Sequence, residues 1–273
     1  MYVYVIISSS QISKDDILGL SAPLPSPTVL SAHAQVYKSY IKSSHAICML
    51  VASLLSARLP LTDQARAAGG LPAIHRLHAA SGDQIRFVRA PAQEASVAGV
   101  ALGEHTDFGS VTVLFNRLGG LQVRLPSDIT PSPPVSMSPP TEVEGRLCAD
   151  GWAYVRPLAG HCIVNLGDAL VKFSNGRLRS NVHRVVAPPG QQGSVERYSL
   201  VYFCRPEDDV VLRSLVQSEA MGDGGEEEDE EEEEQVTAKE WILRRAMGRR
   251  KPDGWEKSNG TESISMRSGE MRT

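Results

Sequence analysis

The sequence reads Gly103-Glu104-His105-Thr106-Asp107-Phe108-Gly109-Ser110 immediately before an apolar, β-branched run at residues 111–115. His105 and Asp107 are two positions apart, and side chains i and i+2 of an extended chain emerge on the same face. An imidazole and a carboxylate placed in this way can bind one metal ion together. The triplet alone is a weak signal, because a polar strand end has the same appearance. A metal site needs further groups, and residues 151–203 contain them.

A third candidate ligand, His183, lies in the apolar stretch 181–186, which predicts a strand. Fourteen residues further on, Arg197 and Ser199 again occupy positions i and i+2. Two His and one carboxylate form the facial triad that binds ferrous iron and leaves adjacent coordination positions open. An Arg beside a hydroxyl suits a carboxylate, because the guanidinium fork binds it bidentately. Together these residues predict an open iron site next to a receptor for a 2-oxo acid.

The pattern of apolar residues changes from helical to extended near residue 84. A long helix is expected at residues 30–59, with shorter ones at 62–68 and 71–80. Residues 2–7 can form a strand that ends at Ser8-Ser9-Ser10. The later strands are expected at 84–90, 111–115, 121–125, 152–156, 161–166, 181–188 and 198–205. Short strands separated by turns predict an antiparallel sandwich or barrel.

Composition and charge narrow the class of protein. The apolar and charged contents, 41% and 22%, are those of a soluble globular protein. Nine of the 32 acidic residues form one run at 226–234, and the other 23 face 28 basic residues, a balance too mild to predict nucleic-acid binding. The apolar start at residues 1–7 is too short for a signal peptide or a membrane span. Scattered cysteines without a Cys-x-x-Cys pair indicate reduced thiols, so we expect a cytoplasmic protein.

Several motifs between residues 99 and 206 resemble, together and in order, one known family. The sequence is similar to the 2-oxoglutarate- and iron(II)-dependent dioxygenases of the isopenicillin N synthase-like family. The motifs are residues 103–110, Gly119-Gly120-Leu121-Gln122-Val123, Asp150-Gly151-Trp152, Asn165-Leu166-Gly167-Asp168, Ser174-Asn175-Gly176-Arg177, His183-Arg184-Val185 and Arg197-Tyr198-Ser199.

The resemblance implies a fold, a site and a reaction. The fold would be mainly β with flanking helices, a double-stranded β-helix or jelly roll. His105, Asp107 and His183 would bind Fe(II), and Arg197 and Ser199 would bind the distal carboxylate of 2-oxoglutarate. With O2 as second cosubstrate, the enzyme would hydroxylate or desaturate a small organic substrate and release succinate and CO2. We expect a monomer that contacts neither nucleic acid nor membrane.

The expected domain organisation follows from this resemblance and from the changes of composition along the chain. Residues 1–83 would be an N-terminal helical region, and 84–215 the jelly-roll domain, interrupted by a Pro/Ser-rich insertion at 126–145. An acidic loop at 216–236 would lead into a C-terminal helix at 237–250, which Thr237 and Glu240 begin with a capping box. Residues 251–273 are expected to be a disordered tail.

Two departures from the family pattern stand out. Family members have a longer N-terminal region, so the region before the jelly roll is expected to be shortened here. The strand before the iron motif carries tyrosines in many relatives, whereas here it reads Ile85-Arg86-Phe87-Val88-Arg89. Phe87 and Arg89 are the candidates for lining the pocket.

Other functions stay open at this point. A ferrous oxidase that does not use 2-oxoglutarate would have the same Arg-x-Ser pair. A catalytically inactive, truncated barrel could act as a binding protein. A hydrolytic zinc site fits two His and one Asp but leaves Arg197 and Ser199 without a role. A Ser-His-Asp hydrolase lacks support, since the sequence has no Gly-x-Ser-x-Gly elbow.

Overall fold

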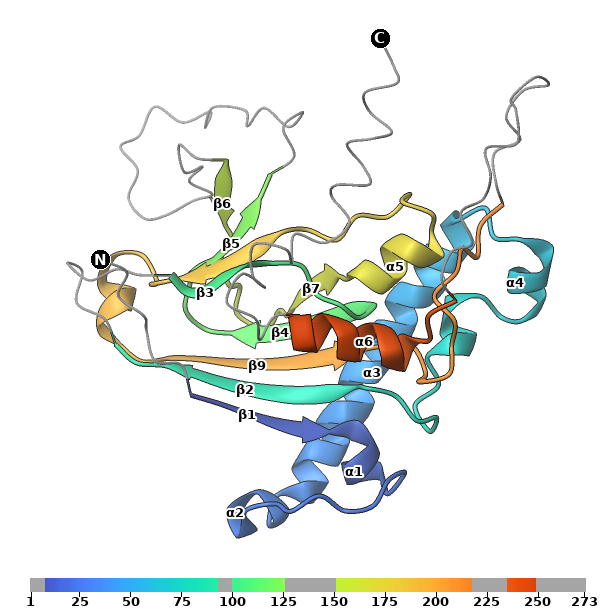
Figure 1. Cartoon of the computed structure of the whole chain (residues 1–273). Coiled ribbons are helices and arrows are strands. Elements are labelled where there is room, and N and C mark those ends of the chain that lie inside the picture. The colour runs from blue at the N-terminus through green and yellow to red at the C-terminus, as the bar shows by residue number, and fades with distance from the viewer. Residues whose placement is uncertain (1–7, 93–99, 126–150, 218–234, 249–273) are drawn as a thin grey trace.

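Two antiparallel β-sheets lie at the centre of the fold (Figure 1). Residues of both sheets line one cavity. This computed structural model describes residues 8–92, 100–125, 151–217 and 235–248. The five-stranded sheet has the order β1 (Ser8–Ser13), β2 (Gln84–Ala90), β9 (Arg197–Cys204), β4 (Val111–Asn116), β7 (Ile163–Leu166). The four-stranded sheet has the order β3 (Val100–His105), β8 (His183–Val186), β5 (Leu121–Arg124), β6 (Trp152–Tyr154). This arrangement confirms the mainly β, antiparallel architecture.

Alternation along the strands gives the five-stranded sheet two different faces. On β9, Ser199, Val201 and Phe203 line the cavity between the sheets. The intervening Tyr202 and Cys204 are buried in the apolar core on the opposite face. The sheet therefore separates an apolar core from a cavity that contains the polar groups.

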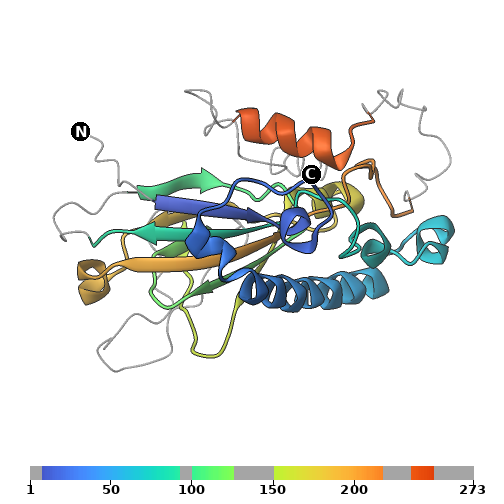
Figure 2. The ribbon, with the colours of Figure 1, turned by 90° about the horizontal axis from the view of Figure 1, so that it is seen from below.

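The longest helix, α3 (Ala34–Arg58), covers the apolar face of this sheet. Its buried residues Ile41, Cys48 and Ala52 belong to the same core as Ile85 and Tyr202 of the sheet. Figure 2 shows α3 on one side of the strands and α6 (Ala238–Gly248) on the other. The remaining helical segments are short: α1 (Lys14–Leu18), α2 (Thr28–Ser31), α4 (Asp63–Ala67), η1 (Leu71–Ile74), α5 (Asp168–Phe173) and η3 (Gly190–Ser194).

By length and composition alone, α3 would also qualify as a membrane-spanning helix. Core helices of soluble proteins meet the same criterion, and one side of α3 packs on the sheet. The predicted lack of membrane contact and the predicted cytoplasmic location stay predictions.

The expected helices and strands agree with the structure in most places and differ at the N-terminus. Thr62 caps α4 by accepting a hydrogen bond from the Ala65 amide (3.1 Å), whereas the helix expected at 71–80 is only the short η1. The strand expected at residues 2–7 lies outside the described residues. Strand β1 occupies the serines at which that strand was expected to end. The 126–145 insertion, most of the acidic loop and the 251–273 tail also lie outside the described residues.

Candidate metal centre

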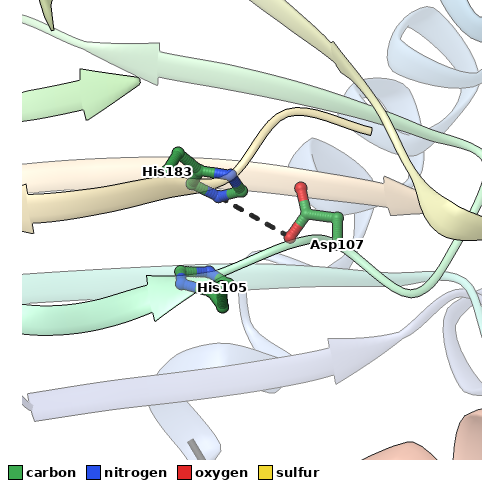
Figure 3. A group of neighbouring side chains, drawn as sticks. All are labelled: His105, Asp107 and His183. Carbon is green, nitrogen blue, oxygen red and sulfur yellow. Dashed lines mark ion pairs between the residues drawn. The ribbon is translucent and has the colours of Figure 1, made fainter. Parts of the chain in front are cut away.

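His105, Asp107 and His183 converge at one end of the four-stranded sheet (Figure 3). His105 ends β3 and is the cross-strand partner of His183, which begins β8, so both side chains stand on the same face. Their ring centroids are 4.3 Å apart. Asp107 follows in the loop before β4, and its Oδ1 lies 3.9 Å from Nε2 of His183. One potential ligand atom from each of the three residues lies within 4.8 Å of the others.

Hydrogen bonds fix the orientation of each of these side chains. Nδ1 of His105 donates to the Gly103 carbonyl (2.8 Å), and Nδ1 of His183 donates to the Asn181 carbonyl (3.0 Å). A carbonyl only accepts, so these bonds place the proton on Nδ1 and make Nε2 the ring nitrogen with a lone pair for a metal. The donor set of two imidazole nitrogens and one carboxylate oxygen fits Fe(II).

The Asp107 carboxylate is prepared for a cation by its surroundings. Its Oδ2 accepts hydrogen bonds from Thr112 Oγ1 (2.7 Å) and Asn165 Nδ2 (2.9 Å). Burial by itself raises the pKa of Asp107, but the two neighbouring imidazoles and these two donors outweigh burial, and the pKa is lowered. A carboxylate that remains ionised is the form that binds a metal.

The Asn165-Leu166-Gly167-Asp168 motif supports the loop that carries Asp107. The Asp168 amide donates to the Asp107 carbonyl (2.8 Å), and the Gly167 amide donates to the Ser110 carbonyl (2.9 Å). A Cβ atom at Gly167 would lie only 2.2 Å from the Gly109 carbonyl oxygen. Only glycine fits here, because the two backbone segments are in close contact. The motif thereby fixes the position of the loop that carries Asp107.

Helix α6 braces the same loop from the outside. The fully buried carboxylate of Asp168 accepts hydrogen bonds from Thr106 Oγ1 (3.0 Å) and from Arg245 of α6 (2.6 Å). Trp241 Nε1 donates to the Phe108 carbonyl (3.3 Å). Thr106 and Phe108 flank Asp107 in sequence, so the C-terminal helix contacts the chain on both sides of a candidate ligand. The sequence predicted α6, but gave no sign that Arg245 contacts the buried Asp168.

Arg197 and Ser199 lie on β9 and line the cavity that contains the three candidate ligands. Arg197 donates from Nε to the Gly119 carbonyl (2.8 Å) and from Nη1 to Ser199 Oγ (2.6 Å). Burial lowers the pKa of Arg197 to about 10, so the guanidinium is still charged at neutral pH. A buried, oriented guanidinium beside a hydroxyl is a receptor for a carboxylate.

The cavity has a volume of about 360 Å³ and mostly apolar walls. Phe87 and Arg89 do not line it, so the prediction chose the wrong face of β2. Phe87 packs its ring against Tyr37 (centroids 5.7 Å apart), and Arg89 forms an exposed ion pair with Glu196. Both face a neighbouring surface hollow instead. Their neighbours on the strand, Arg86 and Val88, line the cavity.

Comparisons with known proteins agree with this geometry. The 2OG-Fe(II) oxygenase superfamily matches residues 83–206. The 2-oxoglutarate-dependent dioxygenase gloE of Glarea lozoyensis is 31% identical over 189 residues, which are 69% of this chain and 49% of that protein. The 2-oxoglutarate-dependent dioxygenase frbH of Dothideomycetidae sp. is 33% identical over 233 residues, 85% of this chain and 59% of that protein. The chain thus spans about half the length of these relatives, or slightly more.

A solved structure has the same fold. A full-length protein of Neurospora crassa, crystallised in complex with alpha-KG, superposes with a TM-score of 0.62 at 24% sequence identity. The superposition covers 90% of this chain and 66% of the Neurospora protein. This likeness confirms the predicted fold class, and the superfamily match covers all five residues proposed from the sequence for metal and carboxylate binding. Residues 83–206 of the chain thus form a domain of the 2OG-Fe(II) oxygenase superfamily.

Proposed function

We propose that this chain is an iron(II)- and 2-oxoglutarate-dependent dioxygenase. It would oxidise a small organic substrate, by hydroxylation or desaturation, with release of succinate and CO2. A monomer that acts on a small molecule remains part of the proposal. The observation that carries it is the presence, in one cavity, of the His105, Asp107 and His183 cluster and the Arg197–Ser199 pair.

Each of the five residues has a distinct role in the proposal. His105, Asp107 and His183 would hold Fe(II) through two imidazole nitrogens and one carboxylate oxygen, a donor set that leaves coordination positions open for other ligands. Arg197 and Ser199 bind the distal carboxylate of 2-oxoglutarate and so fix the direction in which it enters. When bound, the iron supplies the oxidative decarboxylation and the oxidant for the substrate. The apolar walls, among them Leu114, keep water away from that oxidant.

The proposal is tested by measuring succinate formation from 2-oxoglutarate with ferrous iron and O2. The unaltered protein should convert 2-oxoglutarate slowly without substrate, and chelation of iron should stop it. His183→Ala should abolish the conversion, because a facial triad with one imidazole missing no longer holds Fe(II) in place.

A matched control is His161→Ala, since His161 is exposed and does not line the cavity. This variant should keep the activity, and His183→Ala should keep the far-ultraviolet circular dichroism of the unaltered protein. Succinate formation that survives His183→Ala would contradict the proposal. A folded, iron-loaded protein that makes no succinate at all would favour the oxidase that does not use 2-oxoglutarate.

A further inference from the structure

The cavity contains two arginines that the proposed function does not use. Arg86 of β2 and Arg205, directly after β9, line it together with Arg197. Both guanidiniums lie near the ring of Phe203, at 5.0 Å for Arg86 and 5.9 Å for Arg205. Two like charges close together in a buried place require negative charge nearby.

Arg205 has partners within the fold, the Gly82 carbonyl and the carboxylate of Asp83. Its Nη1 donates to the Gly82 carbonyl (2.6 Å), and its amide donates to Oδ1 of Asp83 (2.7 Å). Asp83 is buried and is the carboxylate that most favours the charged form of Arg205. Arg205 is therefore a structural residue that joins the end of β9 to the start of β2.

Arg86 has no equivalent partner among the residues that the structure describes. Its Nε, like that of Arg205, is buried without a hydrogen bond, but Arg86 has no other side-chain hydrogen bond to a described residue, and no described carboxylate forms an ion pair with it. Burial lowers its pKa, and Asp107 is the group that opposes this. In the proposed enzyme Asp107 is an iron ligand, so its negative charge is offset by the metal. The guanidinium of Arg86 is then a half-buried cation without a counter-charge.

Its position separates Arg86 from the receptor for 2-oxoglutarate. In the β2–β9 register, Arg86 pairs with Val201, and Ala90 pairs with Arg197. Four positions along a strand correspond to about 13 Å. The side chain of Arg86 lies over Phe203, which is still further from Arg197. Arg197 itself is held by Gly119 and Ser199. The two guanidiniums therefore bind different anions.

The charges of the proposed complex lead to the same conclusion. The net charge is zero for the set made up of Fe(II), Asp107, the 2-oxoglutarate dianion and Arg197. The negative charge of Asp83 offsets the positive charge of Arg205. The positive charge of Arg86 remains. A bound substrate with one negative charge would make the cavity neutral, which lowers the cost of burying all these groups.

We propose that the substrate is a carboxylic acid with an apolar body, and that Arg86 binds its carboxylate. This inference rests on the proposed function, because it assigns the iron and Arg197 to other ligands. The fork of Arg86 can donate two parallel hydrogen bonds to a carboxylate. Leu114, Val201 and Phe203, which line the cavity beside it, would pack on the apolar body. Arg86 thus selects the class of substrate.

The test compares acids with amides of the same shape. The probes are 3-phenylpropanoate with 3-phenylpropanamide, and hexanoate with hexanamide, titrated calorimetrically into the full chain loaded with Fe(II) and 2-oxoglutarate under anaerobic conditions. Each acid should bind more tightly than its amide. Arg86→Leu should weaken binding of the acids roughly 10- to 100-fold, leave the amides unchanged, and leave the affinity for 2-oxoglutarate unchanged. Arg86→Lys should restore part of the preference for the acid.

Arg89→Leu is the matched control, since Arg89 is on the same strand but its side chain is exposed and does not line the cavity. It should change neither acid nor 2-oxoglutarate binding. Equal affinity for acids and amides in the unaltered protein, or no binding of either acid, would overturn the inference, and this comparison does not depend on any variant folding. An equal loss of 2-oxoglutarate and acid binding in Arg86→Leu would also overturn it, by assigning Arg86 to the cosubstrate. Failure to bind 2-oxoglutarate, with acid preference through Arg86 intact, would instead refute the proposed function alone.

Discussion

Single residues fix the end of the cavity at which we propose that 2-oxoglutarate binds. The Arg197 guanidinium uses one nitrogen for the Gly119 carbonyl and another for Ser199, and both bonds hold the rest of the fork toward the cavity. A Lys at this position has neither the planar fork nor enough directed donors to repeat this.

Arg197→Lys should therefore raise the concentration of 2-oxoglutarate needed for half-maximal succinate formation by roughly 10- to 100-fold. The concentration of Fe(II) needed should change little, because the three candidate ligands are untouched. Steady-state rates of succinate formation, measured while Fe(II) and 2-oxoglutarate are varied in turn, give both concentrations. Equal increases for iron and 2-oxoglutarate would count against the role assigned to Arg197.

Gly167 is a second residue whose identity the structure explains. Gly167→Ala would bring a methyl group within 2.2 Å of the Gly109 carbonyl oxygen and 2.9 Å of the Asp107 carbonyl oxygen. We expect the loop of Asp107 to shift, with a loss of about 1–3 kcal/mol in the free energy of unfolding. Affinity for Fe(II), measured by competition with a chromophoric chelator, should fall as well. A variant as stable as the unaltered protein, with normal iron affinity, would show that this close contact is unimportant.

The residues of the site could be predicted because metal and carboxylate ligands leave a pattern of residue type and spacing. His105, Asp107, His183, Arg197 and Ser199 are all found around one cavity. The error at β2 has a physical reason: both faces of this strand are covered, one by α3 and the other by the cavity. The alternation of side chains along the strand predicts which residues share a face. It does not predict which of the two faces lines the cavity.

At the scale of elements, α6 contacts the chain on both sides of Asp107. Arg245 donates to the buried Asp168 and lies over the rings of Phe108 and Trp241, at 5.1 and 5.3 Å. Burial raises the pKa of Asp168, and the charge of Arg245 acts against this. The ion pair thus joins α6 to the loop that carries Asp107.

Arg245→Ala should destabilise the protein by about 2–4 kcal/mol at neutral pH, because it leaves a buried carboxylate without its cation. Without Arg245 the pKa of Asp168 in the folded protein rises further above its unfolded value. An acid with a raised pKa loses stability as the pH increases through that window, so the deficit should grow from about pH 4 to pH 7.

Denaturant unfolding at several pH values measures this effect, with Lys239→Ala as the control. Lys239 is on the same helix and pairs with Asp208 at the surface (3.4 Å), so its loss should cost at most about 1 kcal/mol at any pH. If both variants lose the same free energy of unfolding at every pH, α6 does not brace the loop of Asp107 through Arg245.

Helix α6 and strand β1 also show what an element's sequence can reveal. The capping box of α6 is present as predicted, with the Glu240 amide donating to Thr237 Oγ1 (3.3 Å) and the Thr237 amide to Glu240 Oε2 (3.0 Å). Strand β1 reads Ser-Ser-Ser-Gln-Ile-Ser, and its single apolar side chain, Ile12, is buried. It is an edge strand that is held by main-chain pairing with β2. Its side chains do not alternate between apolar and polar, so the sequence does not reveal the strand.

At the scale of the whole molecule, the two sheets unite residues that are far apart in the sequence. The cavity takes residues from both sheets, and the iron loop is held by α6 and by the segment that begins α5. The superfamily match covers the residues of the candidate site, whereas the substrate class that we propose is inferred from Arg86, which none of the sequence motifs contains. Family membership and cavity charge are thus separate sources of information about this protein.

The most direct test of the proposed function is an anaerobic titration of 2-oxoglutarate into the iron(II)-loaded protein, followed by visible absorption. Chelation of a 2-oxo acid by ferrous iron gives a charge-transfer band. We predict a saturable band in the unaltered protein, which is absent in Asp107→Ala, weakened in Arg197→Ala and abolished by removal of the iron. A folded protein with bound iron and no band at saturating 2-oxoglutarate would contradict the account.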